Sequence, residues 1–226
     1  MVVRAAILIN YDSVYIASKR EFNLFYLIWW AKKNEAITWM NEFSDFIKSK
    51  IFIQESDLII ILSSFKSKRI KKGQLILKRG QIAYQYFYIR SGALRFFFGE
   101  FGEQLTAWVV FQDEFFTEIS SLNPQKPTRF NIEAIEDTEL LYIDKYNMEN
   151  LYRQFPAWQE FGRITWEAMA VRMIDQIISF QTLSAEERYL EFMEKSELIK
   201  RVPVKQIASY LGITPNALSR IRKNLK

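Results

Sequence analysis

The last 25 residues of the chain, Val202 to Lys226, constrain its fold most, because they predict two short helices joined by a tight turn. The first helix should run from Val204 to about Leu211, and Gly212 permits the sharp corner that follows. The second should begin after Thr214 as N-cap, with Pro215 at a position where a missing amide proton costs nothing. This is helix-turn-helix geometry, in which the second helix can enter a DNA major groove.

The second helix of this pair has an apolar face and a polar face. Helical spacing turns Ala217, Leu218, Ile221 and Leu225 toward a core. The residues left for solvent or a ligand are Asn216, Ser219, Arg220, Arg222 and Lys223.

Positive charge gathers at the same end of the chain. Residues 200–226 hold seven Lys and Arg and no acidic residue, which leaves 24 basic and 26 acidic residues elsewhere. A polyanion would be attracted to this end in a salt-dependent way. The alternative is that the helix pair packs on its own domain and exposes ordinary solvated lysines.

The sequence contains no cysteine and no histidine. Disulfides, thiolate or imidazole metal sites and imidazole catalysis are therefore excluded for these 226 residues. Glu133, Glu136 and Asp137 lie together, but this cluster is typical of an acidic turn between strands. We expect no enzyme activity, no metal and no cofactor.

Membrane and secretion signals are weak. The longest apolar run, residues 22–31, is about half as long as a membrane span requires and is interrupted by Asn23. Asn10 and Asp12 interrupt the apolar start of the chain, which argues against a secretion signal. We expect a cytoplasmic protein with no membrane partner.

Residues 1–39 form an N-terminal extension of uncertain status. They show no helical stripe or strand alternation that connects them to the rest, and Met40 is a plausible domain start. One explanation is that translation begins downstream of Met1. The other is a genuine arm that docks Trp29 and Trp30 on the body of the protein.

From about residue 64 to 143 the sequence has the texture of strands and turns. Five of the seven glycines interrupt short apolar alternations there. The candidate strands are Phe65 to Lys71, Gln74 to Lys78, Tyr86 to Arg90, Ala93 to Gly99, Gln104 to Phe111, Phe130 to Ala134 and Thr138 to Asp144. Short strands at this spacing predict a β-barrel or jelly roll around an aromatic core.

A long helix is predicted from Pro156 to about Thr182. Its apolar residues at helical intervals are Phe161, Ile164, Ala168, Val171 and Ile178. This stripe either pairs with its twin around a two-fold axis, with Ala168 allowing close approach, or packs only on its own roll. Ser184 and Glu187 then form a capping box at the start of the next helix.

This order of parts resembles the Crp/Fnr family of bacterial transcription regulators, over about Met40 to Lys226. Two segments carry the resemblance, KKGQLILKRGQIAYQYFYIRSGALRFFF for a cyclic-nucleotide-binding roll and IASYLGITPNALSRIRKNL for the short helix-turn-helix of Bacteroidetes members. It implies an α+β fold with three parts after the extension at 1–39. These are a cyclic-nucleotide-binding-like β-roll or jelly-roll sensor domain at 40–155, a long interdomain dimerisation helix at 156–183 and a helix-turn-helix DNA-binding domain at 184–226.

The resemblance also implies a function. It describes a homodimeric transcription regulator on a pseudo-palindromic operator, with double-stranded DNA, RNA polymerase and an unknown small-molecule effector as partners. The alternative is a ligand-binding β-roll that acts through protein contacts without DNA. The operator, the direction of regulation and the effector are not encoded in any motif.

The resemblance assigns DNA-binding roles to individual residues. It places Arg220 where a guanine edge is read, and a guanidinium can bond O6 and N7 together. Asn216 stands where many relatives have Glu, and it could pair with adenine. The candidates for phosphate contacts are Thr214, Ser219, Lys205, Arg222 and Lys223.

The effector pocket departs from the family pattern. Relatives that bind cyclic AMP hold it with a Gly-Glu pair and a downstream Arg-Ser, whose counterparts here are Thr117-Glu118 and Thr128, with Arg129 one residue late. The Thr117 side chain would crowd the ligand, and strand alternation can turn Arg129 away from the pocket. Glu118 and Arg129 are the candidate pocket residues. We therefore favour a roll that binds either a different ligand or no ligand over one that binds a cyclic nucleotide.

Overall fold

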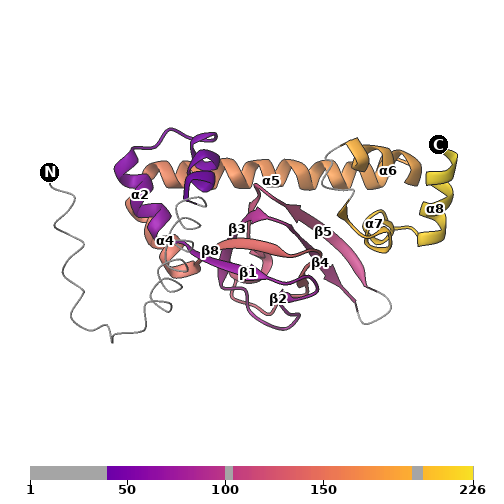
Figure 1. Ribbon diagram of the computed structural model, residues 1–226, viewed down its shortest axis with the longest axis horizontal. Coiled ribbons are helices and arrows are strands. Elements are labelled where there is room, and N and C mark those ends of the chain that lie inside the picture. Colours follow the sequence, from indigo (N-terminus) through magenta and orange to yellow (C-terminus); the bar gives the residue numbers. More distant parts are fainter. Residues whose placement is uncertain (1–39, 100–103, 195–200, 226) are drawn as a thin grey trace, which may run out of the picture. The chain divides into compact units, whose positions relative to one another are not determined.

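The computed structural model describes residues 40–99, 104–194 and 201–225 (Figure 1). The chain divides into two compact units, Met1–Asn41 and Glu42–Lys226, and the second holds all the strands and helices from α2 onward. The predicted extension at 1–39, with Trp29 and Trp30, lies outside the described residues.

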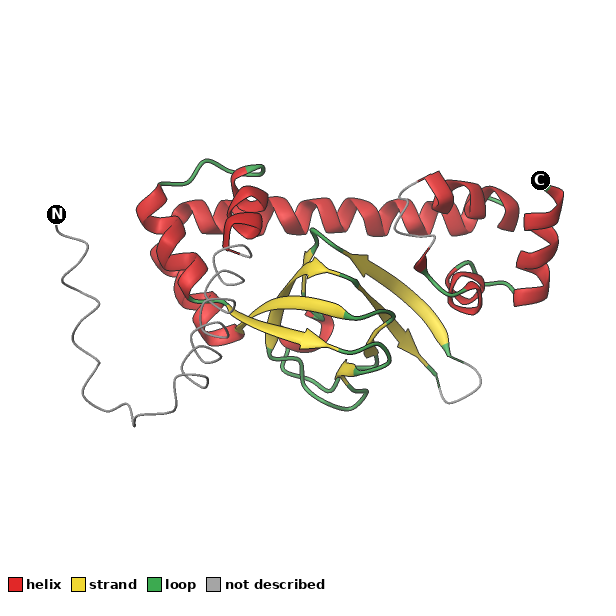
Figure 2. Ribbon diagram, in the orientation of Figure 1, coloured by secondary structure: helices red, strands yellow, loops and turns green. Residues whose placement is uncertain are grey.

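Two antiparallel four-stranded sheets form the roll, and Figure 2 shows their strands gathered beside the long helix. One sheet has the order β1-β8-β3-β6 and the other the order β2-β7-β4-β5. The strands are β1 (Lys66–Ile70), β2 (Leu75–Leu77), β3 (Gln85–Ser91), β4 (Ala93–Phe98), β5 (Leu105–Phe111), β6 (Phe115–Phe116), β7 (Asn131–Ala134) and β8 (Thr138–Asp144). The seven predicted strands are confirmed, and the two-residue β6 was missed.

Apolar side chains from both sheets fill the interior of the roll. Ile89, Leu94, Val110 and Ile132 are fully enclosed there. The turn between β3 and β4 depends on Gly92, whose φ is 96°. A Cβ at this position would lie 2.5 Å from the Thr138 hydroxyl oxygen, so only glycine fits the turn.

Short helices flank the roll, and the sequence reading did not predict them. Residues 40–48 are helical, followed by α2 (Glu55–Ser63), α3 (Ile119–Leu122) and α4 (Lys145–Gln154). The Asp144 carboxylate caps α4 by accepting a hydrogen bond of 2.9 Å from the amide of Asn147.

Helix α5 (Pro156–Thr182) begins and ends where the sequence predicted. Its first turns are buried, with Trp158 and Phe161 fully enclosed and their rings stacked at 4.4 Å. Phe161 also packs edge-on against Phe115 of β6, at 5.4 Å between ring centroids. The prediction that Phe161 lies on a dimer-forming stripe is therefore wrong, because its own chain already covers it.

Three helices follow α5, namely α6 (Ala185–Glu194), α7 (Val204–Tyr210) and α8 (Pro215–Asn224). The capping box predicted for α6 is present, because the Ser184 amide donates to Glu187 Oε2 at 2.7 Å and the Glu187 amide donates to Ser184 Oγ at 3.3 Å. Hydrogen bonds from the Ser184 backbone amide and side chain to the Glu187 carboxylate lower the pKa of Glu187. None of the helices within the described ranges has the length and apolar character to cross a membrane.

The C-terminal helices share a core with the outer face of the roll. This core contains Val109 and Phe111 from β5, with Ile207, Leu211 and Leu218 from the helix pair. The Ser209 hydroxyl on α7 accepts a hydrogen bond of 2.8 Å from the Thr106 amide and donates one of 3.0 Å to the Gln104 carbonyl. Helix α7 is thus fixed to β5 by both packing and hydrogen bonds.

Candidate nucleic-acid interface and roll cavity

Helix α8 begins as the sequence predicts. The Thr214 hydroxyl accepts a hydrogen bond of 3.1 Å from the Ala217 amide, and Pro215 occupies the first turn. The turn before it contains Gly212 with a φ of 71°, a conformation that favours glycine. Leu218 is fully buried, whereas Leu225, which was expected to face the core, is 42% exposed.

Arg188 of α6 holds the turn between α7 and α8. Its guanidinium donates to the Leu183 carbonyl at 2.7 Å and to the Leu211 carbonyl at 3.2 Å, and it lies 4.9 Å from the ring centroid of Phe180. Local sequence patterns do not reveal this role, because Arg188 and Leu211 are 23 residues apart. Arg188 therefore connects the end of α5 to the helix pair.

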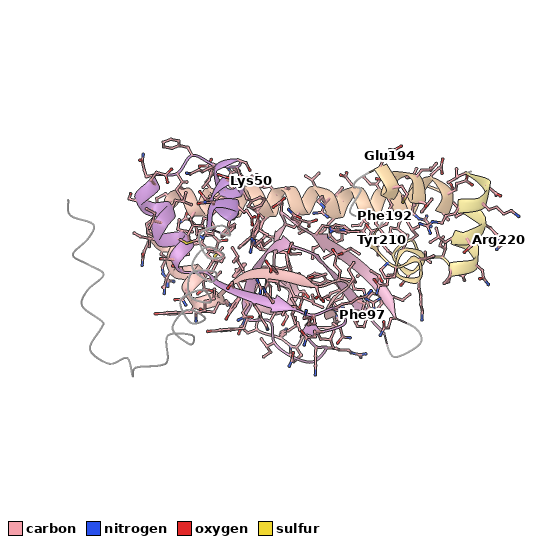
Figure 3. All side chains as sticks on the ribbon, viewed as in Figure 1. Lys50, Phe97, Phe192, Glu194, Tyr210 and Arg220 are labelled. Atoms are coloured by element: carbon pink, nitrogen blue, oxygen red, sulfur yellow. The ribbon has the colours of Figure 1, made fainter. Side chains whose placement is uncertain are left out.

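One face of α8 is exposed and polar. The predicted contact residues that are exposed are Thr214, Asn216, Ser219, Arg220 and Lys223 on or beside α8, and Lys205 on α7. Figure 3 shows Arg220 on the outer side of α8, away from Phe192 and Tyr210. The Ser219 hydroxyl donates to the Pro215 carbonyl at 2.9 Å, which keeps it close to the helix backbone.

Arg222 differs from these residues and corrects the prediction that groups it with them. Its Nε donates to the Tyr189 hydroxyl at 2.9 Å, and its guanidinium lies 5.7 Å from the centroid of that ring. The side chain is half-buried. Arg222 thus fixes α8 to α6 within the chain, and we remove it from the set of predicted phosphate contacts.

The second half of α5 exposes a cluster of large apolar side chains. The members are Val171, Met173, Ile174, Ile177 and Ile178, each between 50% and 57% exposed. Of the residues predicted for a dimer helix, Ala168, Val171 and Ile178 are exposed and Ile164 is half-buried. Only Phe161 is enclosed by its own chain.

A cavity of about 620 Å³ lies between the roll and α5. The roll residues that line it are Phe96, Ala107, Trp108, Val110, Phe116, Thr117, Glu118, Ile119, Ser120 and Phe130. From α5 the lining residues are Trp166, Met169, Ala170, Met173, Gln176, Ile177, Phe180 and Gln181. The same helix that carries the exposed cluster therefore forms one wall of the cavity.

Glu118 lines this cavity, as predicted, and is 4% exposed. Its Oε1 accepts hydrogen bonds from the Ser120 amide at 3.0 Å and from the Ser120 hydroxyl at 2.6 Å. Its Oε2 is buried and has no hydrogen-bond partner among the described residues. The neighbouring Thr117 donates its hydroxyl to the Gln85 carbonyl at 2.7 Å.

Arg129, the other predicted pocket residue, lies elsewhere. It is exposed and does not line the cavity, so the prediction is wrong. The preceding Thr128 is buried and accepts a hydrogen bond of 3.0 Å from the Phe130 amide, while Phe130 is a lining residue. Arg129 lies in a bend just before β7, where its side chain is exposed while the next residue, Phe130, lines the cavity.

These residues do not fit a cyclic nucleotide. A buried phosphate requires a paired cation or free backbone donors, and none of the residues that line the described cavity is Lys or Arg. Thr117 stands where the cyclic-AMP-binding pattern described above has a glycine, so its side chain would crowd the approach of a ligand to the backbone. The size of the cavity suits a small molecule, but its chemistry does not suit an anionic one.

Comparison with known proteins supports the fold. Residues 67–155 match the family model of the cyclic nucleotide-binding domain. A mutant of CooA from Carboxydothermus hydrogenoformans has a similar structure, with a TM-score of 0.60 and 20% identity over 73% of this chain and 78% of that one. FixK2 from Bradyrhizobium japonicum gives a TM-score of 0.59 and 19% identity over 71% and 84%.

A third similar structure is a protein from Eubacterium rectale described as a regulator of the Crp/Fnr family. It has a TM-score of 0.60 and 16% identity over 76% of this chain and 83% of that one. A search of curated protein sequences finds no match. Residues 67–155 are therefore similar in sequence to cyclic nucleotide-binding domains, and the chain has the fold seen in these solved structures, among them a regulator of the Crp/Fnr family.

Proposed function

We propose that this protein is a sequence-specific DNA-binding transcription regulator of the Crp/Fnr type that acts as a homodimer. In this proposal residues 40–155 form the sensor, 156–183 the dimerisation helix and 184–226 the DNA-binding part. The observation that carries the proposal is the exposed polar face of α8, which stands on the buried Leu218 and begins at the Thr214 cap. A helix with this construction can lie in the major groove of a DNA duplex.

Each exposed residue that the resemblance assigns to DNA contacts has a role in the proposal. Arg220, which forms no ion pair within the described part of the chain, reads a guanine through two parallel hydrogen bonds. Asn216 lies one turn earlier and pairs with adenine N6 and N7. Thr214, Ser219, Lys205 and Lys223 contact phosphates, which fixes the register of the helix without reading sequence.

The exposed apolar cluster on α5 supports the homodimer. Side chains such as Ile174 and Ile177 are more than half exposed, and burying them against a second copy would remove them from water. A two-fold axis along α5 would present two copies of α8 to half-sites about 34 Å apart. This arrangement predicts a pseudo-palindromic operator.

Effector control would act through α5. Met173 and Ile177 belong both to the cavity wall and to the exposed cluster, so a ligand in the cavity would contact the dimerisation helix directly. If the ligand favours one pose of α5, it shifts the population of dimers able to bind DNA. RNA polymerase as a further partner remains a prediction from the resemblance.

The proposal is tested by gel-shift assays on genomic fragments at several salt concentrations. The wild-type protein should shift a subset of fragments, and Lys205→Gln with Lys223→Gln should weaken binding to all of them and reduce the salt dependence. Lys126→Gln, at an exposed position on the roll, is the matched control and should bind like the wild type. Absence of any salt-dependent DNA binding by the wild type would contradict the proposal and favour a roll that acts through protein contacts.

A further inference from the structure

One guanidinium lies where the carboxyl ends of two helices meet. Leu183 is the C-cap residue of α5, and Leu211 is the C-cap residue of α7. The Arg188 side chain on α6 donates to the Leu183 carbonyl at 2.7 Å and to the Leu211 carbonyl at 3.2 Å. The last carbonyls of a helix lack partners within the helix and carry partial negative charge, so a cation that bonds to both ends stabilises their approach.

Phe180, near the end of α5, forms the third contact of Arg188. The guanidinium lies 4.9 Å from the centroid of the Phe180 ring. The same ring borders the turn before α8, because a Cβ placed on Gly212 would lie 3.5 Å from its Cε1. The two hydrogen bonds and the ring contact of Arg188 therefore join the end of α5, helix α6 and the turn between α7 and α8.

A neighbouring residue of α6 holds α8 itself. Tyr189 is 7% exposed, and its hydroxyl accepts a hydrogen bond of 2.9 Å from Arg222 Nε. Leu218 of α8 is fully buried in a core that also contains Tyr189. These contacts oppose movement of α8 relative to α6, and the contacts of Arg188 oppose movement of the helix pair relative to α5.

We propose that Arg188 is a positioning residue that sets the orientation of α8 relative to α5, and thereby the half-site spacing that the dimer accepts on DNA. The inference rests on the proposed function, in which α5 lies at the two-fold axis and α8 reads each half-site. A rotation of α8 relative to α5 in both chains would change the separation of the two reading faces. Base preference within a half-site comes from the exposed residues of α8 and does not depend on Arg188.

The first experiment needs no DNA. The sequence contains no cysteine, so Glu160→Cys on α5 and Asn224→Cys on α8 provide two exposed sites for spin labels. Labelled chains are diluted into excess unlabelled protein, so that each dimer holds one labelled chain, and electron–electron double resonance gives the distribution of distances between the labels.

The labelled protein should give one narrow distribution. Arg188→Met should broaden it at least about twofold, because the two helix ends lose their shared donor. Arg79→Met, at an exposed position on the roll, is the matched control and should leave the distribution unchanged.

The second experiment measures the spacing preference on DNA. Duplexes selected by the wild type from a random pool provide the preferred operator, and two further duplexes carry one base pair more or fewer between the half-sites. One base pair moves a half-site by about 3.4 Å along the duplex and by about 34° around it.

The wild type should bind the selected spacing at least about tenfold more tightly than either changed spacing. Arg188→Met should reduce this preference to about twofold or less, a change of the size expected when hydrogen bonds to a charged group are lost. Arg188→Lys keeps the positive charge beside both helix ends, so its preference should lie between those of the wild type and Arg188→Met.

A purely structural role of Arg188 predicts a different result. If Arg188→Met only destabilised the helix pair, the preference for guanine within a half-site would fall together with the spacing preference, and this result would overturn the proposal. An unchanged distance distribution or an unchanged spacing preference in Arg188→Met would overturn it as well. If the wild type binds no DNA but Arg188→Met broadens the distances, the proposed function fails and the role of Arg188 in orienting α8 stands.

Discussion

Both halves of α5 carry large apolar side chains, but the halves differ in how these side chains are covered. In the first half Trp158 and Phe161 are fully enclosed by the roll and its flanking helices. In the second half Val171, Ile174 and Ile178 are each at least half exposed. A single helix thus combines a part that its own chain stabilises with a part whose apolar side chains remain available to a partner.

This difference shows why helical periodicity alone misassigned one residue. Phe161 and Val171 lie on the same predicted stripe, but only Phe161 is close to rings from distant segments, including Phe46 at 6.0 Å and Phe115 at 5.4 Å. Spacing identifies a face of a helix. It does not identify what covers that face.

The largest expected effect is the loss of stability when a buried ring in the first half of α5 is removed. Phe161→Ala should lower the free energy of unfolding by about 3–5 kcal/mol, because it removes a fully buried ring and leaves a cavity. Val171→Ala, from the exposed half, should change it by less than about 0.5 kcal/mol at concentrations where the protein is monomeric. Urea unfolding followed by circular dichroism measures both, and equal effects of the two changes would abolish the contrast.

The next prediction concerns the exposed half. Ile174→Glu combined with Ile178→Glu should raise the dimer dissociation constant at least about hundredfold, because it places like charges in the interface. Sedimentation velocity should show a folded monomer. The matched control is Ile59→Glu with Ile60→Glu on α2, where both residues are exposed, and this variant should remain dimeric. A dimer in the first variant would contradict the assignment of α5.

Close packing of the buried half can be tested at Gly162. A Cβ there would lie 2.7 Å from the Tyr152 hydroxyl oxygen and 2.8 Å from its ring, so Gly162→Ala should destabilise the protein by about 1 kcal/mol despite the helix preference for alanine. In a Tyr152→Leu background the clash is gone, and the same change should be neutral or stabilising. If Gly162→Ala is stabilising in both backgrounds, the packing is looser than described.

The smallest expected effect lies at the boundary between the halves. Glu114 Oε2 is 2.7 Å from Arg172 of α5, and burial raises the pKa of Glu114 above its ordinary value of 4.5 despite this ion pair. A raised pKa in the folded state means that the contribution of Glu114 to stability is full below pH 4.5 and is lost as the pH rises through the folded value. The wild type should therefore lose stability relative to Glu114→Gln as the pH rises from 4 to 7. Urea titrations at several pH values measure this difference in the free energy of unfolding, and we expect it to be the smallest of the effects described here. A constant or increasing advantage would contradict the direction of the shift.

Much of the fold could be predicted from the sequence because its signals are local. Glycines and alternating apolar residues delimit the strands, and Pro156 and Ser184 mark the limits of α5 and the start of α6. Helix α2 was missed because Ile59 and Ile60 are exposed, which blurs its apolar face. Helix α4 has a mostly polar sequence in which only Met148 and Leu151 are buried, so few apolar residues mark it as a helix.

The candidate sites were predictable to the same degree. The exposed face of α8 follows from the Thr214 cap and helical spacing, which act within ten residues. Arg222 was misassigned because its partner Tyr189 lies 33 residues away. The cavity depends on contacts between the roll and α5, so the resemblance could indicate Glu118 but not the aromatic wall around it.

The central claim is that α8 reads DNA sequence through Arg220. Duplexes selected by the wild type from a random pool provide a preferred site, and affinities for this site and for an unrelated duplex are then measured at one salt concentration. Arg220→Ala should lose about 1–3 kcal/mol of preference for the guanine at one position of each half-site, with little change on the unrelated duplex. Arg129→Ala is the matched control and should keep the wild-type preference for guanine. If Arg220→Ala also keeps this preference in full, the claim is contradicted.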